Sequence, residues 1–251
     1  MVLSVVSMSA RRQGPCEAAS EATGVEGFDP CALLGEPVLQ EVSVPHGSAV
    51  LEGLVALATA TSRGFTLRVR DTLSSREGGR LHARGLMHAR GDAAKLVLAT
   101  ARNAREALWA AEAGLLCPAV GAVVIEIHGE PRALDFTATR RLAMAAERHR
   151  TPCLLARVSA SSKASAARRR WALASEPAST DPYDDRAPGT PHWQLDLVRA
   201  RDRTPEAWSL RREGEGFRAI PRRQEAEIAR EGMPAFSGDV VPLGLASAAP
   251  A

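Results

Sequence analysis

The residues whose spacing comes nearest to a catalytic motif lie in VPHGSAVLEG, residues 44–53. This segment follows the alternating run LQEVSV (39–44) and leads into LEGLVALATATSR (51–63), which has the apolar spacing of a helix. A strand, a glycine-containing turn and a helix form the frame of a phosphate-binding loop, in which backbone amides bind the phosphates. The candidate phosphate-loop residues are Gly47, Ser48 and Gly53.

The same segment lacks the charge that a working phosphate loop requires. A G-x-x-x-x-G-K-[ST] loop needs a lysine that reaches the β- and γ-phosphates and a hydroxyl that binds magnesium. Gly47 and Gly53 do not have this spacing, the only lysines are Lys95 and Lys163, and no arginine occurs between residues 13 and 62. We therefore expect a degenerate loop in a protein that is not an enzyme, without catalytic residues, a cofactor or a metal.

Glu126 is the other candidate for catalysis. It stands in VVIEIHG (123–129), near the end of an apolar run that reads as a central parallel strand. Ligands of open α/β sheets bind at that edge, where a carboxylate can hold a magnesium-bound water. The alternative, which the missing lysine favours, is a buried glutamate paired with an arginine or with His128. The sequence contains no GxSxG, HExxH or CxxC motif.

A basic cluster follows a loop of small residues in SASSKASAARRRWALA (159–174). A mobile cationic loop with an aromatic side chain suits the phosphate backbone of single-stranded DNA. A solvated strand edge, whose charges discourage aggregation, is an equally good interpretation. The candidate DNA-binding residues are Lys163, Arg168, Arg169, Arg170 and Trp171.

The composition is that of a soluble globular protein. The 251 residues are 45% hydrophobic and 24% charged, and the net charge of +3 permits contact with nucleic acid without requiring it. The start, MVLSVVSMSARR, has no basic n-region, and no apolar run approaches 18 residues. These features predict a cytoplasmic protein that makes no contact with a membrane.

The elements that must position these residues follow an α/β pattern. Strand patterns alternate with helix patterns, one helix with Asn103 as its cap and another with Asp135 or Thr137. This order predicts a mostly parallel sheet between helices. The two alternating runs in residues 193–213 predict a C-terminal antiparallel hairpin. The predicted strands of the parallel part are 39–44, 65–70, 95–100, 120–127 and 151–157.

Three regions differ in composition. We expect residues 1–34 to be a flexible N-terminal arm, residues 35–217 to be the core domain, and residues 218–251 to be a partly disordered tail. The apolar residues of the tail can serve as a docking peptide, stay disordered or fold back on the core. The candidate partner-binding residues are Met233, Phe236, Val240, Val241 and Leu243.

Four segments, in this order, resemble the ImuA family of RecA-like accessory proteins in bacterial SOS mutagenesis. The resemblance covers roughly residues 35–213 and implies a RecA-like core, in which residues 159–171 occupy the place of a DNA-contacting loop of RecA. Like the cell-division inhibitor SulA, such a protein has the RecA shape without the ATPase motif. The segments are NAREALWAAEAGLL, VGAVVIEIHGEPRALDFTATRRLAMAAERHRTPCLLAR, RRRWALASEP and PHWQLDLVRARDRTPEAWSLR.

The resemblance also implies a function and partners. It implies a non-catalytic protein of SOS-induced error-prone translesion synthesis that binds ImuB and RecA, and that acts indirectly with an error-prone DnaE-type polymerase. Its core would cap a RecA filament or compete within it. Two alternatives remain: a SulA-like inhibitor that binds the division protein FtsZ, and a divergent RecA-family ATPase with a site near Glu126.

Overall fold

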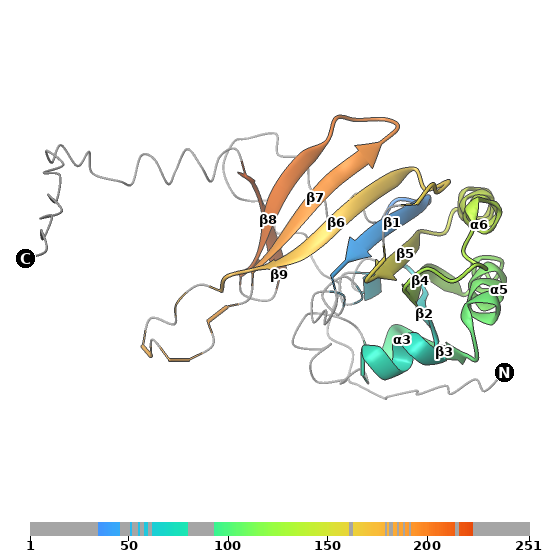
Figure 1. Cartoon of the computed structure of the whole chain (residues 1–251), viewed down its shortest axis with the longest axis horizontal. Coiled ribbons are helices and arrows are strands. Elements are labelled where there is room, and N and C mark those ends of the chain that lie inside the picture. Colours follow the sequence, from blue (N-terminus) through green and yellow to red (C-terminus); the bar gives the residue numbers. More distant parts are fainter. Residues whose placement is uncertain are drawn as a thin grey trace, which may run out of the picture.

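The computed structural model describes residues 35–45, 51, 55, 58–59, 62–79, 93–160, 163–178, 192–213 and 216–222, with some positions between 180 and 190. These residues form one sheet with helices (Figure 1). The predicted N-terminal arm lies outside the described residues. So do the predicted phosphate-loop residues Gly47, Ser48 and Gly53, and the predicted partner-binding residues Met233, Phe236, Val240, Val241 and Leu243.

The nine described strands form a single sheet in the order β3-β2-β4-β5-β1-β6-β7-β8-β9. All pairs from β3 to β6 are parallel, whereas β6, β7, β8 and β9 pair antiparallel. The predicted mostly parallel α/β sheet with an antiparallel C-terminal part is therefore confirmed. The strands are β1 (Leu39–Val44), β2 (Phe65–Asp71), β3 (Leu96–Ala101), β4 (Val120–His128), β5 (Cys153–Val158), β6 (Arg169–Glu176), β7 (His192–Ala200), β8 (Glu206–Glu213) and β9 (Gly216–Pro221).

The described helices begin where short polar side chains cap them. The predicted caps Asn103 and Asp135 accept hydrogen bonds from the backbone amides of Glu106 and Ala138, at 3.0 Å and 2.7 Å. The sequence pattern predicts no helix directly after residue 71, but one begins beside Asp71, whose carboxylate accepts from the Ser74 amide at 2.8 Å. The helices are α3 (Thr72–Glu77), α5 (Ala104–Leu115) and α6 (Phe136–His149), with a 3₁₀ turn at Ala93–Lys95.

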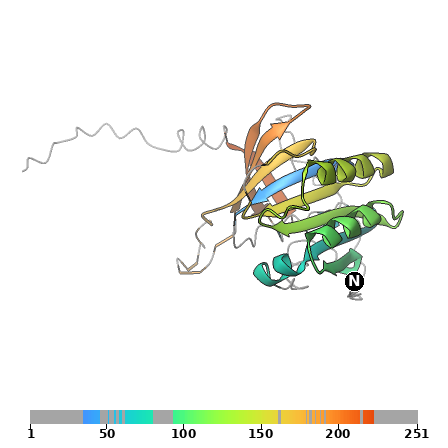
Figure 2. The same cartoon turned by 45° about the vertical axis from the view of Figure 1, so that its right-hand side comes forward.

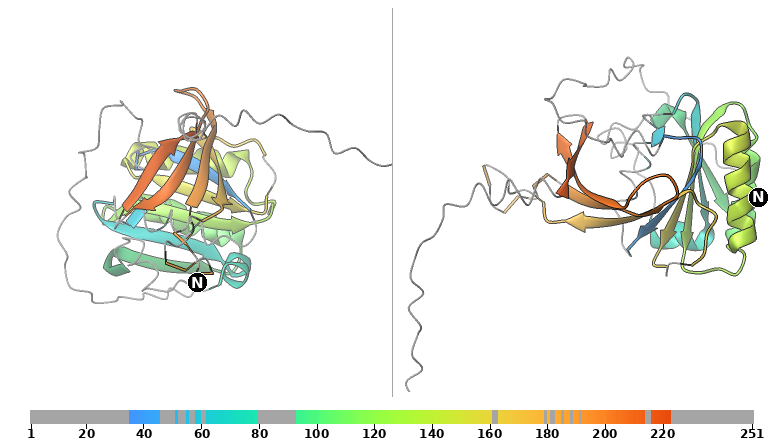
Figure 3. Two further views of the ribbon diagram at one scale, coloured as in Figure 1. Left: turned by 90° about the vertical axis from the view of Figure 1, so that its left-hand side faces the viewer. Right: turned by 90° about the horizontal axis from the view of Figure 1, so that it is seen from above.

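The core lies on both faces of the parallel strands. Helices α5 and α6 cover one face of the sheet (Figure 2). Their small and apolar residues form one cluster with Val123, Ile125 and Leu155. On the other face, the helical positions Leu51 and Val55 pack in one cluster with Trp171 and Trp208. The antiparallel strands extend past β1 and curve away from α5 and α6 (Figure 3).

One further strand lengthens the antiparallel part beyond the predicted hairpin. Strand β9 pairs with β8 in the register Ser209↔Ile220 and Arg211↔Arg218. The predicted boundary between core and tail, at residue 218, falls inside this strand. The parallel strands have two opposite ends that matter for function. At one lie the carboxyl ends of β2 and β4, and at the other lie the amino ends of β4 and β5.

Candidate functional site

Glu126 lies buried at the carboxyl edge of the sheet between two arginines of β2. Its side chain is 2% exposed. Arg68 Nη2 lies 2.7 Å from Glu126 Oε2, and Arg70 Nε lies 2.9 Å from the same oxygen. Arg70 Nη2 donates to the other oxygen, Oε1, at 3.1 Å. The predicted buried glutamate paired with arginine is confirmed, with two partners from the neighbouring strand.

Helix α3 closes over this cluster. Arg70 also donates to the backbone carbonyls of Ser74 and Gly79, at 2.5 Å and 2.8 Å. The Ser74 hydroxyl accepts from the backbone amide of His128 at 3.1 Å, which ties α3 to β4. A Cβ at Gly78 would collide with the Arg70 guanidinium and lie 2.8 Å from Glu126 Oε1. Both oxygens of Glu126 thus accept a hydrogen bond from an arginine of β2, and Gly78 packs against the pair.

A second buried carboxylate, Glu41, lies in the middle of the central strand β1. Arg170 Nη2 lies 2.9 Å from Glu41 Oε1, and Arg157 Nη1 lies 3.5 Å from the same oxygen. The three residues come from three adjacent strands, β5, β1 and β6, so the cluster joins the two strands that flank β1. The sequence pattern did not predict this site, because Glu41 stands in an alternating run with no motif around it.

Three of the five predicted DNA-binding residues are engaged inside the sheet. Trp171 is 1% exposed, and its indole Nε1 donates to Gln40 Oε1 at 2.8 Å. Arg169 is 2% exposed and pairs with Glu36 at 2.9 Å and with Asp202 at 2.5 Å. Arg170 binds Glu41. An expected surface role does not fit Trp171 or Arg169, because neither side chain reaches solvent.

Asp202 takes its electrostatic state from this arrangement. Burial opposes its ionisation, but the hydrogen bond from Arg169 and the charges of Arg169 and Arg168 outweigh that effect and lower the pKa of Asp202 below its usual value. The carboxylate therefore stays ionised and balances the buried guanidinium of Arg169.

Lys163 and Arg168 are the members of the predicted set that stay on the surface. Lys163 is 55% exposed and its Nζ lies 2.5 Å from Glu130 Oε2. Arg168 is 44% exposed and lies 3.7 Å from Asp202 and 4.0 Å from Glu147. Each cation has a carboxylate beside it, which reduces the positive potential that this segment offers to a phosphate backbone.

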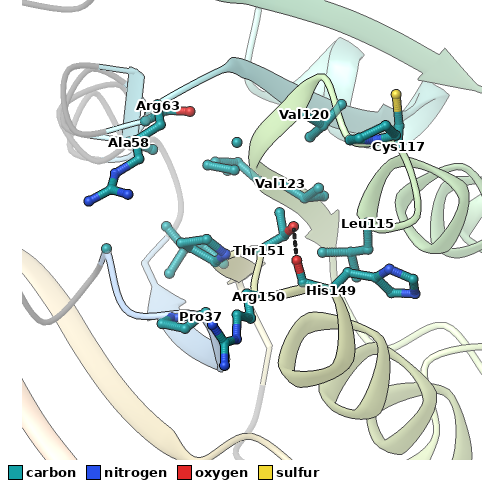
Figure 4. A pocket seen from close by; sticks show the side chains of 18 of the residues that line it. Pro37, Ala58, Arg63, Leu115, Cys117, Val120, Val123, His149, Arg150 and Thr151 are labelled. Atoms are coloured by element: carbon teal, nitrogen blue, oxygen red, sulfur yellow. Dashed lines mark hydrogen bonds between the residues drawn. The ribbon is translucent and has the colours of Figure 1, made fainter.

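A cavity of about 640 Å³ lies at the opposite edge, around the amino ends of β4 and β5 (Figure 4). Its basic lining residues are Arg63, which precedes β2, and His149 and Arg150, which end α6. The turn after α6 is held by Thr151 Oγ1, which donates to the carbonyl of His149 at 3.2 Å. The sequence pattern did not predict this cavity, although an arginine at a helix end where glycine is usual was a possible signal.

Neither a metal cluster nor a membrane helix is found in the described part of the chain. No three His, Cys, Asp or Glu side chains among those residues are grouped so that they could bind one metal ion. None of the helices described there combines the length and the apolar character that a membrane crossing needs. Of the described cysteines, Cys117 is exposed and Cys153 is buried.

Comparisons with known proteins find relatives for most of the chain. No protein-family model matches the sequence. Two curated relatives, both named Protein ImuA, come from Caulobacter vibrioides strains NA1000 / CB15N and ATCC 19089 / CIP 103742 / CB 15. Each is 31% identical over 197 residues, a match that covers 70% of this chain and 78% of the relative. A solved structure of the RadB recombinase matches 74% of this chain and 91% of its own, with a TM-score of 0.49 and 17% identity.

Proposed function

The chain belongs to the ImuA family, and on that basis we propose that it is a non-catalytic, RecA-like accessory protein of SOS-induced error-prone translesion DNA synthesis. The observation that carries the proposal is the 31% identity to Protein ImuA over 70% of the chain. In this role the protein acts in the cytoplasm and binds ImuB and RecA. Its connection to an error-prone DnaE-type polymerase is indirect.

The state of Glu126 supports the non-catalytic part of the proposal. A nucleotide hydrolase needs a carboxylate that is free to orient magnesium and water at the carboxyl edge of the sheet. Here Glu126 accepts a hydrogen bond from Arg68 with one oxygen and from Arg70 with the other. Gly78, at the end of α3, packs against Arg70 and Glu126. These contacts support a structural role for Glu126, because its carboxylate is already paired within the protein.

The predicted DNA-binding set offers little exposed positive charge in the described part of the chain. Lys163 and Arg168 are the exposed members of the predicted DNA-binding set, and both lie beside carboxylates. A protein that releases few counterions binds single-stranded DNA weakly and with a shallow dependence on salt. We therefore place the main function in protein–protein contacts, with any contact to single-stranded DNA made through this segment.

The experiment that tests the function is a pull-down from DNA-damaged cells of the source organism. The tagged full chain is the bait, mass spectrometry identifies the recovered proteins, and undamaged cells that carry the same tagged chain are the control. We expect ImuB and RecA to be enriched after damage. Recovery of FtsZ without ImuB or RecA would instead assign the chain to the class of division inhibitors.

A further inference from the structure

The cavity at the amino edge has a cationic rim that the described residues do not neutralise. Arg63, His149 and Arg150 are exposed, and none of them forms an ion pair with a described residue. Among the described lining residues there is no carboxylate. This contrasts with Lys163, Arg168, Arg169 and Arg170, each of which lies beside a glutamate or an aspartate. Within the described part of the chain, the guanidiniums of Arg63 and Arg150 therefore carry positive charge with no carboxylate paired to them.

The rest of the cavity is mainly apolar. Apolar side chains line it from the end of α5, from the segment that follows α5, from β4 and from β5; they include Leu115, Pro118, Val120, Val123 and Leu154. The volume of about 640 Å³ falls in the range of ligand pockets, roughly 300–1,000 Å³. An apolar wall below a cationic rim is complementary to an apolar side chain with carboxylates on both sides.

The backbone of Arg150 is a second sign that the rim has a use. Arg150 ends α6 in the left-handed conformation, with φ 51° and ψ 39°. Glycine or asparagine is usual at this position, because a Cβ is disfavoured there. An arginine kept in this conformation places a guanidinium at the mouth of the cavity, as Figure 4 shows beside Pro37.

The residues that precede Gly35 have acidic and apolar side chains, which are complementary to the basic rim and the apolar wall. Gly35 and Pro37 line the cavity, so the preceding residues are tethered to it. The sequence of residues 17–34, EAASEATGVEGFDPCALL, contains four acidic residues and no lysine, arginine or histidine. Phe28 stands between Glu26 and Asp29, and an extended chain from Gly35 to Phe28 spans at most about 25 Å.

We propose that this cavity binds the chain's own acidic segment, residues 17–34, with Phe28 against the apolar wall and Glu26 and Asp29 beside Arg63 and Arg150. The tether gives the segment an effective concentration in the millimolar range. Weak contacts are therefore sufficient, and two exposed ion pairs of ordinary strength with one buried aromatic side chain meet that need.

Cross-linking between native cysteines tests the proposal on the full chain. Cys31 belongs to the segment, and Cys117 is exposed on the cavity wall. Cys16→Ser removes the other thiol of the N-terminal region, and Cys153 is buried, which raises the pKa of its thiol to about 12 and keeps it unreactive. We expect a short bismaleimide to join Cys31 to Cys117 within one chain, as read by mass spectrometry of the proteolysed monomer.

Charge reversal then separates binding from mere proximity. We expect Arg63→Glu with Arg150→Glu to lower the yield of the cross-link about fivefold or more, and Glu26→Arg with Asp29→Arg to do the same. Combining all four changes should restore the yield. The matched control reverses Arg199 and Arg201, which are exposed at the end of β7 and directly after it, and should leave the yield unchanged.

Two results would overturn the proposal. An intramolecular yield that does not respond to either charge reversal would show that the rim does not recognise the segment. A cross-link that joins two chains would assign the cavity to a second copy. If reversal of the two rim arginines prevents folding, as judged by circular dichroism, the variant with reversed Glu26 and Asp29 gives the same test with an unchanged cavity.

Discussion

At the scale of single residues, the buried ion clusters have the sharpest consequences. Glu126 and Glu41 each lie between two arginines from neighbouring strands. Burying such groups is costly, and the mutual attraction offsets the cost only while every partner is present. Substitution of one of these glutamates should therefore lower the free energy of unfolding.

Glu126→Gln should destabilise the protein by about 3–5 kcal/mol, because it leaves two buried guanidiniums without their anion. The free energy of unfolding from urea titration measures the effect. Glu112→Gln is the matched control, since Glu112 pairs with the exposed Arg141 at 2.9 Å and such pairs contribute only about 0–1 kcal/mol. Equal losses in the two variants would contradict the assigned role of Glu126.

Asp202 gives a prediction for pH dependence. Its pKa is lower in the folded chain than the usual 3.8, so ionised Asp202 stabilises the fold at pH values above 3.8, and this contribution is lost as the pH falls through the folded pKa. We expect Asp202→Asn to be less stable than the unmodified chain at pH 6, with a difference that narrows below pH 3.8. Urea midpoints measured from pH 6 to pH 2.5 report it, and a constant difference would rule out the ion pair as the cause.

At the scale of elements, strand β6 joins the two parts of the sheet. It pairs parallel with β1 and antiparallel with β7, and its Trp171 lies 6.1 Å, between ring centroids, from Trp208 of β8. The face that β6 turns to the core is therefore shared by both parts. A change at this strand should weaken both of them together.

Trp171→Ala should cost about 3–5 kcal/mol, the usual result of removing a large buried aromatic side chain. Trp109→Ala on α5 is the control, because Trp109 is exposed and such surface changes usually stay within about 0.5 kcal/mol. Thermal unfolding followed by circular dichroism measures both. A small effect at Trp171 would mean that its indole is not part of the core.

The sequence pattern predicted the elements better than it predicted their contacts. The apolar runs of β4 and β5 and the caps Asn103 and Asp135 are local signals, and each predicted its element. Helix α3 was missed because TLSSRE has no apolar face, and it is stabilised by Asp71 and by contacts to Arg70 and His128. Strand β9 was also missed, because GFRAIP has no clear apolar alternation and forms a strand by pairing with β8.

The candidate site was predicted only where local reasoning was sufficient. The missing lysine favoured a buried Glu126. Its partners Arg68 and Arg70 could not be predicted, because they depend on the pairing of β2 with β4. The run RRRW seemed to be a surface patch because it is charged. Its alternate residues Arg169 and Trp171 face inward, and the partners of Arg169 lie 133 and 33 residues away. No local pattern reveals such distant partners.

At the scale of the whole molecule, the proposed accessory role predicts no turnover of ATP. The purified full chain should release no phosphate from ATP above background, with or without single-stranded DNA, because the carboxylate at the carboxyl edge is held by arginines. A phosphate-release assay measures this, with a known RecA-type ATPase as the positive control. Hydrolysis that follows enzyme concentration would return the divergent ATPase to consideration.

The central position of β1 has a consequence for the time at which the fold can form. Its buried Glu41 binds Arg157 and Arg170, which follow it by 116 and 129 residues. At synthesis rates of about 5–20 residues per second, β1 leaves the ribosome roughly 6–23 seconds before the first of these partners does. During that interval Glu41 is exposed to water, and its charge opposes premature burial of this strand until both arginines are available.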